Sequence, residues 1–247
     1  MKHLYILIGF FIFFCESIIS QNIDSLKLQY QVNSEPNKKV RLLIQIGHAL
    51  EKKDLDSSIF YYKKALTFQK KMSDTLLARV YSSMGTANLL KGNIDICLDN
   101  QIKALKIYEN HPSNPDVLKV YNSIALVYFY QGDFEKALIN FNHVKSLLDK
   151  NILTDSLKVN QIKGKLLNNI GIIYDNKSQL DLALEYFMQA STHSKKANDS
   201  ENLSSVYSNM GLIYLKGKRY ELAEAIFTEA LTIRKKENNI YGLCKSN

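Results

Sequence analysis

Apolar residues along most of the chain recur at the spacing of amphipathic helices. Within residues 121–144, a first apolar stripe follows the i, i+3, i+4, i+7 spacing that places side chains on one face of a helix, and it consists of Tyr121, Ile124, Ala125 and Tyr128. Gly132 interrupts this pattern. A second stripe follows it, formed by Phe134, Ala137, Leu138 and Phe141. The stretch therefore predicts two short helices joined by a Gln-Gly-Asp turn.

The same order of aromatic and small residues occurs five times. One small residue in each first helix marks the register, at Gly47, Gly85, Ala125, Gly171 and Gly211. This pattern resembles the tetratricopeptide repeat (TPR), a helix-turn-helix unit of about 34 residues. The markers here are spaced more widely than that, as in the long-period repeats of bacterial sensors and kinesin light chains. The resemblance implies an all-α, right-handed superhelical solenoid of tandem helix pairs.

The repeat pattern also divides the chain. It predicts five units at about 40–72, 75–110, 115–150, 155–197 and 200–237, with a shorter inter-helix turn in the first unit and an extended first helix in the fourth. Residues 21–39 are expected to form a capping helix and connector, because the terminal repeats of a solenoid need a covered face. Residues 238–247 are expected to start a sixth helix that is cut off. Before the third unit, Asn114 suits an N-cap and Pro115 the first helical position.

Residues 1–20 have the layout of a secretory signal peptide. Lys2 precedes an apolar run from Leu4 to Phe14, and a polar, small-residue segment ends at Ser20. A membrane anchor is the alternative, but Glu16 interrupts the run and about 20 apolar residues are needed to span a bilayer. We therefore expect a bacterial protein that is exported to the periplasm or secreted. Contact with a membrane would come only through an uncleaved signal or a missing C-terminal part.

A search for catalytic and ligand-binding motifs gives a negative result. The sequence contains no HExxH, CxxC, GxxxxGK[ST], GxGxxG or GxSxG motif. The histidines are scattered and none has a second ligand four residues on. Cys97 occupies a small-residue position of a second helix, where a buried thiol packs like alanine. No catalytic residue, metal ligand or cofactor is therefore expected, and the chain is interpreted as non-enzymatic.

The net charge of +8 makes nucleic acid a partner to consider. The lysines, however, are dispersed as pairs, and several pairs lie near the ends of second helices, where cations favour the helix dipole. An exported chain also rarely meets nucleic acid. A protein or peptide is therefore the expected partner.

The resemblance to TPR proteins implies a binding surface on the first helices, which line a concave groove. The residues at its partner-facing positions combine cations, short amides and an aromatic side chain, and they are Arg79, Lys119, Asn122, Phe129, Lys165, Asn168, Asn169 and Asn209. Asparagine amides both donate to and accept from a peptide backbone, and lysine or arginine binds carboxylates. The alternatives are that the polar residues are solvated surface, that Phe129 belongs to the core, and that the convex face binds instead.

Three classes of function remain open at this level. The first is an exported scaffold that binds an extended segment in the groove. The second is the periplasmic sensor portion of a longer membrane histidine kinase or helix-turn-helix regulator, continuing beyond residue 247. The third is a protein whose catalytic domain lies beyond that residue.

Overall fold

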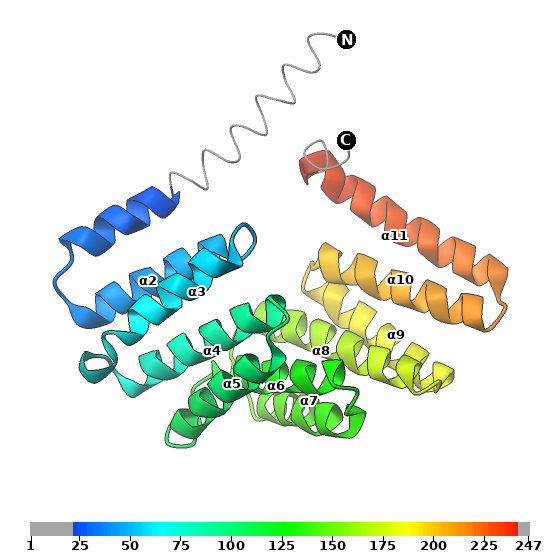
Figure 1. The fold of residues 1–247 in the computed structure, drawn as a ribbon. Coiled ribbons are helices and arrows are strands. Elements are labelled where there is room, and N and C mark those ends of the chain that lie inside the picture. The colour runs from blue at the N-terminus through cyan, green and yellow to red at the C-terminus, as the bar shows by residue number, and fades with distance from the viewer. Residues whose placement is uncertain (1–21, 242–247) are drawn as a thin grey trace, which may run out of the picture. The chain divides into compact units, whose positions relative to one another are not determined.

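The computed structural model describes residues 22–241, and their side chains as far as residue 236. This part of the chain is helical throughout, without a strand (Figure 1). Residues 22–32 form a leading helix. The elements that follow are α2 (Pro36–Leu50), α3 (Leu55–Leu66), the 3₁₀ turn η1 (Gln69–Lys71), α4 (Asp74–Leu90), α5 (Ile94–Tyr108), α6 (Val117–Tyr130), α7 (Phe134–Asp149), α8 (Ser156–Asn176), α9 (Leu180–Lys196), α10 (Ser200–Lys216) and α11 (Tyr220–Tyr241).

The chain divides into two compact units between Asn140 and Phe141, within α7. In the N-terminal unit α2 packs against α3, α4 packs against α5, and α4 also contacts α2 and α6. In the C-terminal unit α8 packs against α9, α10 packs against α11, and α10 contacts both α8 and α9. The first helices α4 and α10 thus each contact their own second helix and the first helix of a neighbouring pair, as expected for tandem TPR pairs.

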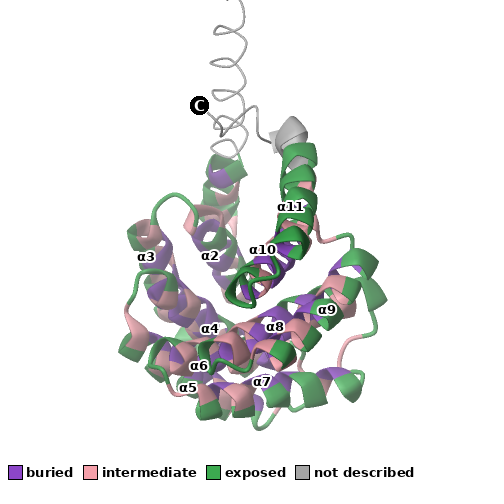
Figure 2. Ribbon diagram, turned by 90° about the vertical axis from the view of Figure 1, so that its right-hand side faces the viewer, coloured by how far each residue is buried: buried purple, intermediate pink, exposed green. Residues whose placement is uncertain are grey.

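Each unit has an apolar core on the helix faces that the stripes predict. Val40, Leu43 and Tyr62 centre one cluster in the N-terminal unit, and Phe187 and Val206 centre another in the C-terminal unit. Figure 2 shows the buried residues on the sides where helices meet and the exposed residues on the outer sides. The burial follows from the 3.6-residue period, which keeps apolar residues on one side of each helix.

Small residues of the first helices allow close packing against large side chains of the second. A Cβ atom at Gly171 would lie 2.6 Å from Cε1 of Phe187, and one at Gly211 would lie 2.6 Å from Cε1 of Phe227. Gly47 has the same relation to Tyr62, and this pair is closer in sequence than Gly171 and Phe187. The predicted shorter turn of the first repeat is nevertheless wrong, because residues 51–54 join α2 to α3, whereas the shorter segment 177–179 joins α8 to α9. In the second repeat, the buried Gln101 takes the place of the aromatic residue, against Gly85.

The crossing in the fourth repeat differs in detail from the sequence expectation. The order of small and aromatic residues in the sequence predicts that Ala183, in the second helix of the fourth repeat, crosses the first helix near Gly171. Ala183 is fully buried, but the side chain against Gly171 is Phe187, one turn further along α9. The first helix of this repeat, α8, has 21 residues, compared with 17 in α4 and in α10, which agrees with its expected extension.

The start of α6 also differs from the sequence expectation, with a consequence for the Asp116 side chain. The sequence suggested Asn114 as its N-cap and Pro115 as its first residue, but the N-cap is Asp116 and the helix begins at Val117. The Asn114 side chain accepts a hydrogen bond from the backbone N–H of Asp116, 2.9 Å away, and closes a turn before the helix. The Asp116 carboxylate does not cap its own helix, so it is available to other partners.

The two ends of the described region modify the expected boundaries. The leading helix ends at residue 32, and α2 begins at Pro36, shortly before the predicted start of the first repeat at residue 40. Residues 238–241, predicted to open a sixth helix, instead continue α11. The predicted signal peptide, 1–20, and residues 242–247 lie outside the described residues. Between residues 22 and 241, no helix combines the length and apolar character needed to span a bilayer.

Candidate functional site

The N-terminal unit contains a polar cavity of about 250 Å³ on the side of its first helices. Its wall is built by α2, α4 and α6, with one tyrosine from the second helix α5. The lining residues are His48, Glu51, Arg79, Ser82, Ser83, Thr86, Tyr108, Asp116, Lys119, Asn122 and Ser123. Arg41 lies on the same side of the unit, in an adjoining hollow that also contains His48, Arg79 and Lys119. The cavity therefore presents charges of both signs and several hydroxyl groups.

One carboxylate organises the cations of this cavity. Nε and Nη2 of Arg79 donate to Oδ2 of Asp116, at 2.8 and 2.6 Å. Nζ of Lys119 lies 3.6 Å from the other carboxylate oxygen. The Asp116 side chain is 17% exposed, whereas Arg79 and Lys119 are 47% and 70% exposed. Two cations thus share one nearly buried anion, and both cations retain an accessible part.

A hydrogen-bonded network around His48 and Glu51 forms another part of the lining. The hydroxyl of the buried Tyr62 donates to Oε1 of Glu51 at 2.6 Å, and Nδ1 of His48 lies 3.0 Å from the same oxygen. Nε2 of His48 lies 3.4 Å from Oγ of Ser83 on α4. Burial by itself would raise the pKa of Glu51, but the hydrogen bonds with His48 and Tyr62 and the charge of nearby Lys119 lower it overall. Glu51 is therefore ionised at neutral pH.

Ser83, His48 and Glu51 are connected in the same order as the serine, histidine and carboxylate of a hydrolytic triad. Ser83 lies in the middle of α4, where backbone N–H groups bond to the preceding turn of the helix. A pair of free N–H groups for a developing oxyanion, which such catalysis uses, is therefore not formed around Ser83. The arrangement is better explained as a polar contact that links α2 to α4.

In the C-terminal unit, the corresponding first-helix surface repeats one of these features. Lys165 of α8 lies 3.5 Å from Oδ2 of Asp199, the N-cap of α10, just as Arg79 binds the N-cap of α6. Nδ2 of Asn209 donates to Oδ1 of Asn168 at 2.9 Å, which joins α10 to α8. Beyond these polar contacts, Leu212 and Leu215 on α10 are 48% and 42% exposed.

The structure thus places the sequence-predicted residues in two groups. Arg79, Lys119 and Asn122 meet in the cavity of the N-terminal unit. Lys165, Asn168, Asn169 and Asn209 belong to α8 and α10, where Asn168 is buried and bonded to Asn209 while Asn169 is half-buried. Phe129 does not line the cavity: it is half-buried, and its ring contacts Tyr130 and Phe134, with centroids 5.6 and 5.9 Å away.

Three contributors to the surface were missed by sequence reasoning. Asp116 and Asp199 are the N-caps of the following first helices, and each lies in the repeat after the cation that it binds. A search for acidic residues one repeat downstream of each cation would have found them. Tyr108 was missed because it comes from a second helix, and only the packing of α5 beneath α4 and α6 brings it to the cavity.

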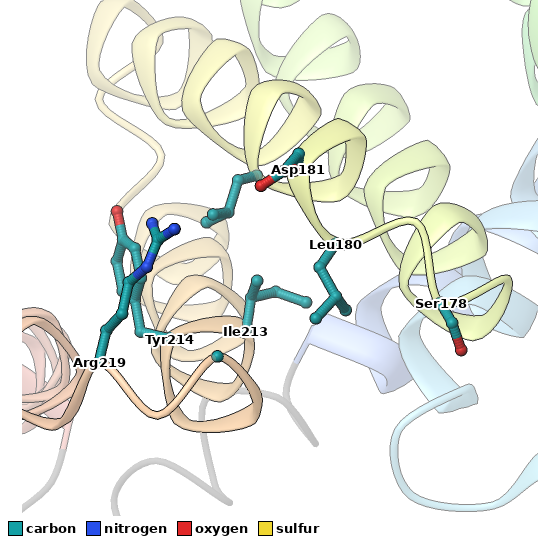
Figure 3. A pocket seen from close by; sticks show the side chains of 8 residues that line it. Ser178, Leu180, Asp181, Ile213, Tyr214 and Arg219 are labelled. Carbon is teal, nitrogen blue, oxygen red and sulfur yellow. The ribbon is translucent and has the colours of Figure 1, made fainter.

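A second hollow, of about 300 Å³, lies in the C-terminal unit at the turns that join first and second helices. Leu180 of α9 and Ile213 of α10 point toward each other across it, and Tyr214 and Arg219 stand side by side on another wall (Figure 3). Its wall includes exposed turn residues such as Ser178 and Arg219. It is therefore a gap between successive turns, with less polar structure than the cavity of the N-terminal unit.

The remaining candidates for chemistry are structural. Cys97 is fully buried, and burial raises the pKa of its thiol to about 11, so it is protonated at neutral pH, although a hydrogen bond with Gln101 acts in the opposite direction. Within residues 22–236, no group of three or more histidine, cysteine or acidic side chains is arranged to hold a metal ion.

Several solved structures share this fold. BtubC (BKLC) from P. vanneervenii is 20% identical with a TM-score of 0.71, and the match covers 90% of each chain. The apo form of the quorum sensor NprR from B. thuringiensis is 18% identical with a TM-score of 0.73, over 98% of this chain and 67% of that chain. A chain of the Cut9–Hcn1 hetero-tetramer of the APC/C is 19% identical with a TM-score of 0.71, and the match covers 94% of this chain and 40% of that chain.

These identities establish similarity of fold alone. No curated protein matches the chain. The sequence model of the tetratricopeptide repeat matches residues 76–150 and 164–236, which together make up more than half of the chain. The match agrees with the helix pairs of both units. The chain therefore belongs to the tetratricopeptide repeat family.

Proposed function

We propose that this protein is an exported, non-enzymatic scaffold that binds an extended peptide or protein segment along its first helices. Its repeat fold is that of a protein-binding scaffold. The observation that carries the finer proposal is the cavity of the N-terminal unit, where Arg79, Lys119 and Asn122 meet. Accessible cations, amides and hydroxyls supply the donors and acceptors that a peptide backbone and its polar side chains require.

The surface of the C-terminal unit supports the same proposal by different means. Leu212 and Leu215 lie one turn apart on α10 and are 48% and 42% exposed. Exposed leucines beside hydrogen-bonded polar residues suit a segment that contributes apolar side chains as well as backbone groups. Lys165 and Asn209 lie on the same pair of first helices, α8 and α10.

Two charge-reversal variants test the site, one inside the cavity and one outside it as a control. Lys119→Glu changes an exposed cation of the cavity, and Lys103→Glu changes an exposed cation of the second helix α5, whose present partner is Asp99. Display selection from a library of random short peptides should yield binders for the wild type and for Lys103→Glu, but different or weaker binders for Lys119→Glu. Absence of binders to the wild type, or equal effects of both variants, would contradict the proposal.

Export is tested separately. The proposal expects expression in a related bacterial host to give protein whose N-terminus, measured by mass spectrometry, lies near Gln21. An intact Met1 in the cytoplasmic fraction would refute it. The alternative function, the periplasmic sensor portion of a longer signalling protein, shares the predicted signal peptide followed by repeats. A run of about 20 apolar residues and kinase or helix-turn-helix motifs downstream of residue 247 would favour that alternative.

A further inference from the structure

The positive charge of the chain is concentrated in its first helix pair. Residues 38–71 contain nine lysine and arginine residues and three acidic residues, a net charge of +6, whereas the whole chain carries +8. This segment comprises most of α2, all of α3 and the 3₁₀ turn η1. Its lysines are separate pairs in the sequence, and a separate pair is normally solvated surface. Whether the pairs act together depends on how the helices pack.

Folding brings three of these pairs to one edge of the N-terminal unit. Helices α2 and α3 pack against each other across a short turn, so the start of α2 lies beside the end of α3. The ammonium groups of Lys39 and Lys64 both lie over the ring of Tyr30, 5.2 and 4.7 Å from its centroid. The Asn37 side chain accepts a hydrogen bond from the backbone N–H of Ser73, 3.1 Å away and just after η1. We name this surface the basic edge, and it consists of Lys38, Lys39, Lys63, Lys64, Lys70 and Lys71.

The basic edge is accessible and is not neutralised within the described part of the protein. Four of its lysines are exposed, and the other two are half-buried against Tyr30. None of the six forms an ion pair with a carboxylate of residues 22–236. By contrast, Lys91 and Lys103 of the next helix pair each have a carboxylate partner. Like charges gathered in this way repel each other, and an anionic partner would relieve that repulsion.

An exposed aromatic side chain lies next to the basic edge. Phe60, on α3, is 58% exposed, and it precedes Lys63 and Lys64 by three and four residues, the spacing of one helix face. Ile59 and Tyr62 already supply the buried side of this helix, so the core does not require an aromatic residue at position 60. Lysines beside an exposed phenylalanine are the combination by which surface helices bind anionic membranes.

We propose that the basic edge and Phe60 bind the surface of an anionic lipid bilayer, with the lysines at the headgroup phosphates and the phenyl ring in the interfacial layer. Each lysine near such a surface raises the partition coefficient about fivefold. None of these residues lines the cavity of the N-terminal unit, so this inference does not depend on peptide binding. It adds a membrane contact made by the folded repeats, which the sequence did not lead us to expect.

The residue types favour a bilayer over nucleic acid. All six cations of the basic edge are lysines, which act as hydrated point charges without a fixed geometry. Arginine, which makes the bidentate contacts that read bases, occurs once in residues 38–71. That residue, Arg41, lines the hollow beside the cavity instead. Lysines suit a layer of mobile headgroups, for which no fixed geometry is needed.

Vesicle co-sedimentation of the full chain tests the proposal. The vesicles consist of phosphatidylcholine alone or of phosphatidylcholine mixed with anionic phosphatidylglycerol. Lys70→Glu with Lys71→Glu changes the basic edge, and Lys52→Glu with Lys53→Glu is the control with the same change in charge. The control pair lies in the turn between α2 and α3, at the opposite end of this helix pair from η1 (Figure 1). The 12 residues of α3 span about 18 Å, more than the screening length of about 10 Å in 0.1 M salt.

The wild type should bind the mixed vesicles in preference to phosphatidylcholine, and added salt should weaken this binding. The Lys70→Glu and Lys71→Glu variant should lose more than about tenfold in partition coefficient, and the control less than about twofold. Both variants change exposed side chains, so their thermal midpoints should equal that of the wild type. Residues 1–20 are common to all forms, so the predicted signal peptide contributes equally to each.

A second measurement follows Phe60 without changing the lysines. The chain contains no tryptophan, so Phe60→Trp introduces a single fluorescent reporter. Tyr220→Trp, at a 60% exposed position of the C-terminal unit, is the control. Mixed vesicles should shift the emission of Phe60→Trp to shorter wavelength and leave that of Tyr220→Trp unchanged.

Equal binding to both kinds of vesicle would overturn the proposal, as would an equal loss in the two lysine variants. Unshifted emission from vesicle-bound Phe60→Trp would also overturn it, because the basic edge would then not face the bilayer. Binding to duplex DNA that depends on Lys70 and Lys71, without binding to mixed vesicles, would assign the basic edge to nucleic acid instead.

Discussion

Replacing Gly171 with alanine tests how the two helices of the fourth repeat pack. The added Cβ would lie 2.6 Å from Cε1 and 2.7 Å from Cδ1 of Phe187, which is closer than carbon atoms approach without displacement. Phe187 is only 1% exposed, so its ring has no free space to enter. Either the ring or the helix must therefore move.

Two opposing terms set the size of the effect. Overpacking a dense core costs about 1–3 kcal/mol. Alanine also favours a helix interior over glycine by about 1 kcal/mol. Gly171→Ala should therefore lower the free energy of unfolding by about 0–2 kcal/mol. If Phe187 is first changed to leucine, which keeps Cδ1 but lacks Cε1 and Cζ, part of the overpacking term disappears and Gly171→Ala should become less destabilising.

The free energy of unfolding is measured by urea denaturation for the wild type, the two single variants and the double variant, which together form a double-mutant cycle. Hydrogen exchange of peptides from α8 and α9 should localise the effect, because a solenoid shares stability mainly between neighbouring repeats. The expected coupling between the two sites is about 1–3 kcal/mol. If Gly171→Ala has the same effect with leucine at position 187, the ring does not restrict the crossing and the assigned packing is wrong.

Further predictions concern packing, the ion pair and pH. Ala183→Leu, at a fully buried position, should cost about 1–3 kcal/mol in a thermal melt, and an unchanged midpoint would refute the repeat register. Asp116→Asn should lower the thermal midpoint, since Arg79 loses its charged acceptor, and an unchanged midpoint would contradict this. The lowered pKa of Glu51 means that its stabilising contribution is present above its ordinary value of 4.5 and is lost as pH falls through the lower folded value. Glu51→Gln should therefore flatten the acid side of the stability profile, and an unchanged profile would refute that role. Phe129→Ala should lower the midpoint if the contact with Phe134 is structural, whereas a constant midpoint with lost peptide capture would assign Phe129 to binding.

The sequence by itself determined the repeats and the positions of their helices. Apolar stripes with a period of 3.6 residues identify each helix, and a small residue in each first helix marks where a large side chain of the second helix must approach. Gly171 and Phe187 show this, since the sequence located the crossing to within one turn. The sequence also placed Arg79, Lys119 and Asn122 on one surface, and the structure brings these three residues to one cavity.

The tertiary structure decided which of these polar groups remain available to a partner. Arg79 binds Asp116, and Asn168 binds Asn209, through contacts between residues 37 and 41 positions apart that no local pattern specifies. Asp116 became an acceptor because Asn114 closes the turn before α6 and leaves that carboxylate uncommitted. Tyr108 reaches the cavity only through the packing of α5. Periodicity reports which side of a helix faces inward, but hydrogen-bond partners depend on distances between helices, and only packing sets those distances.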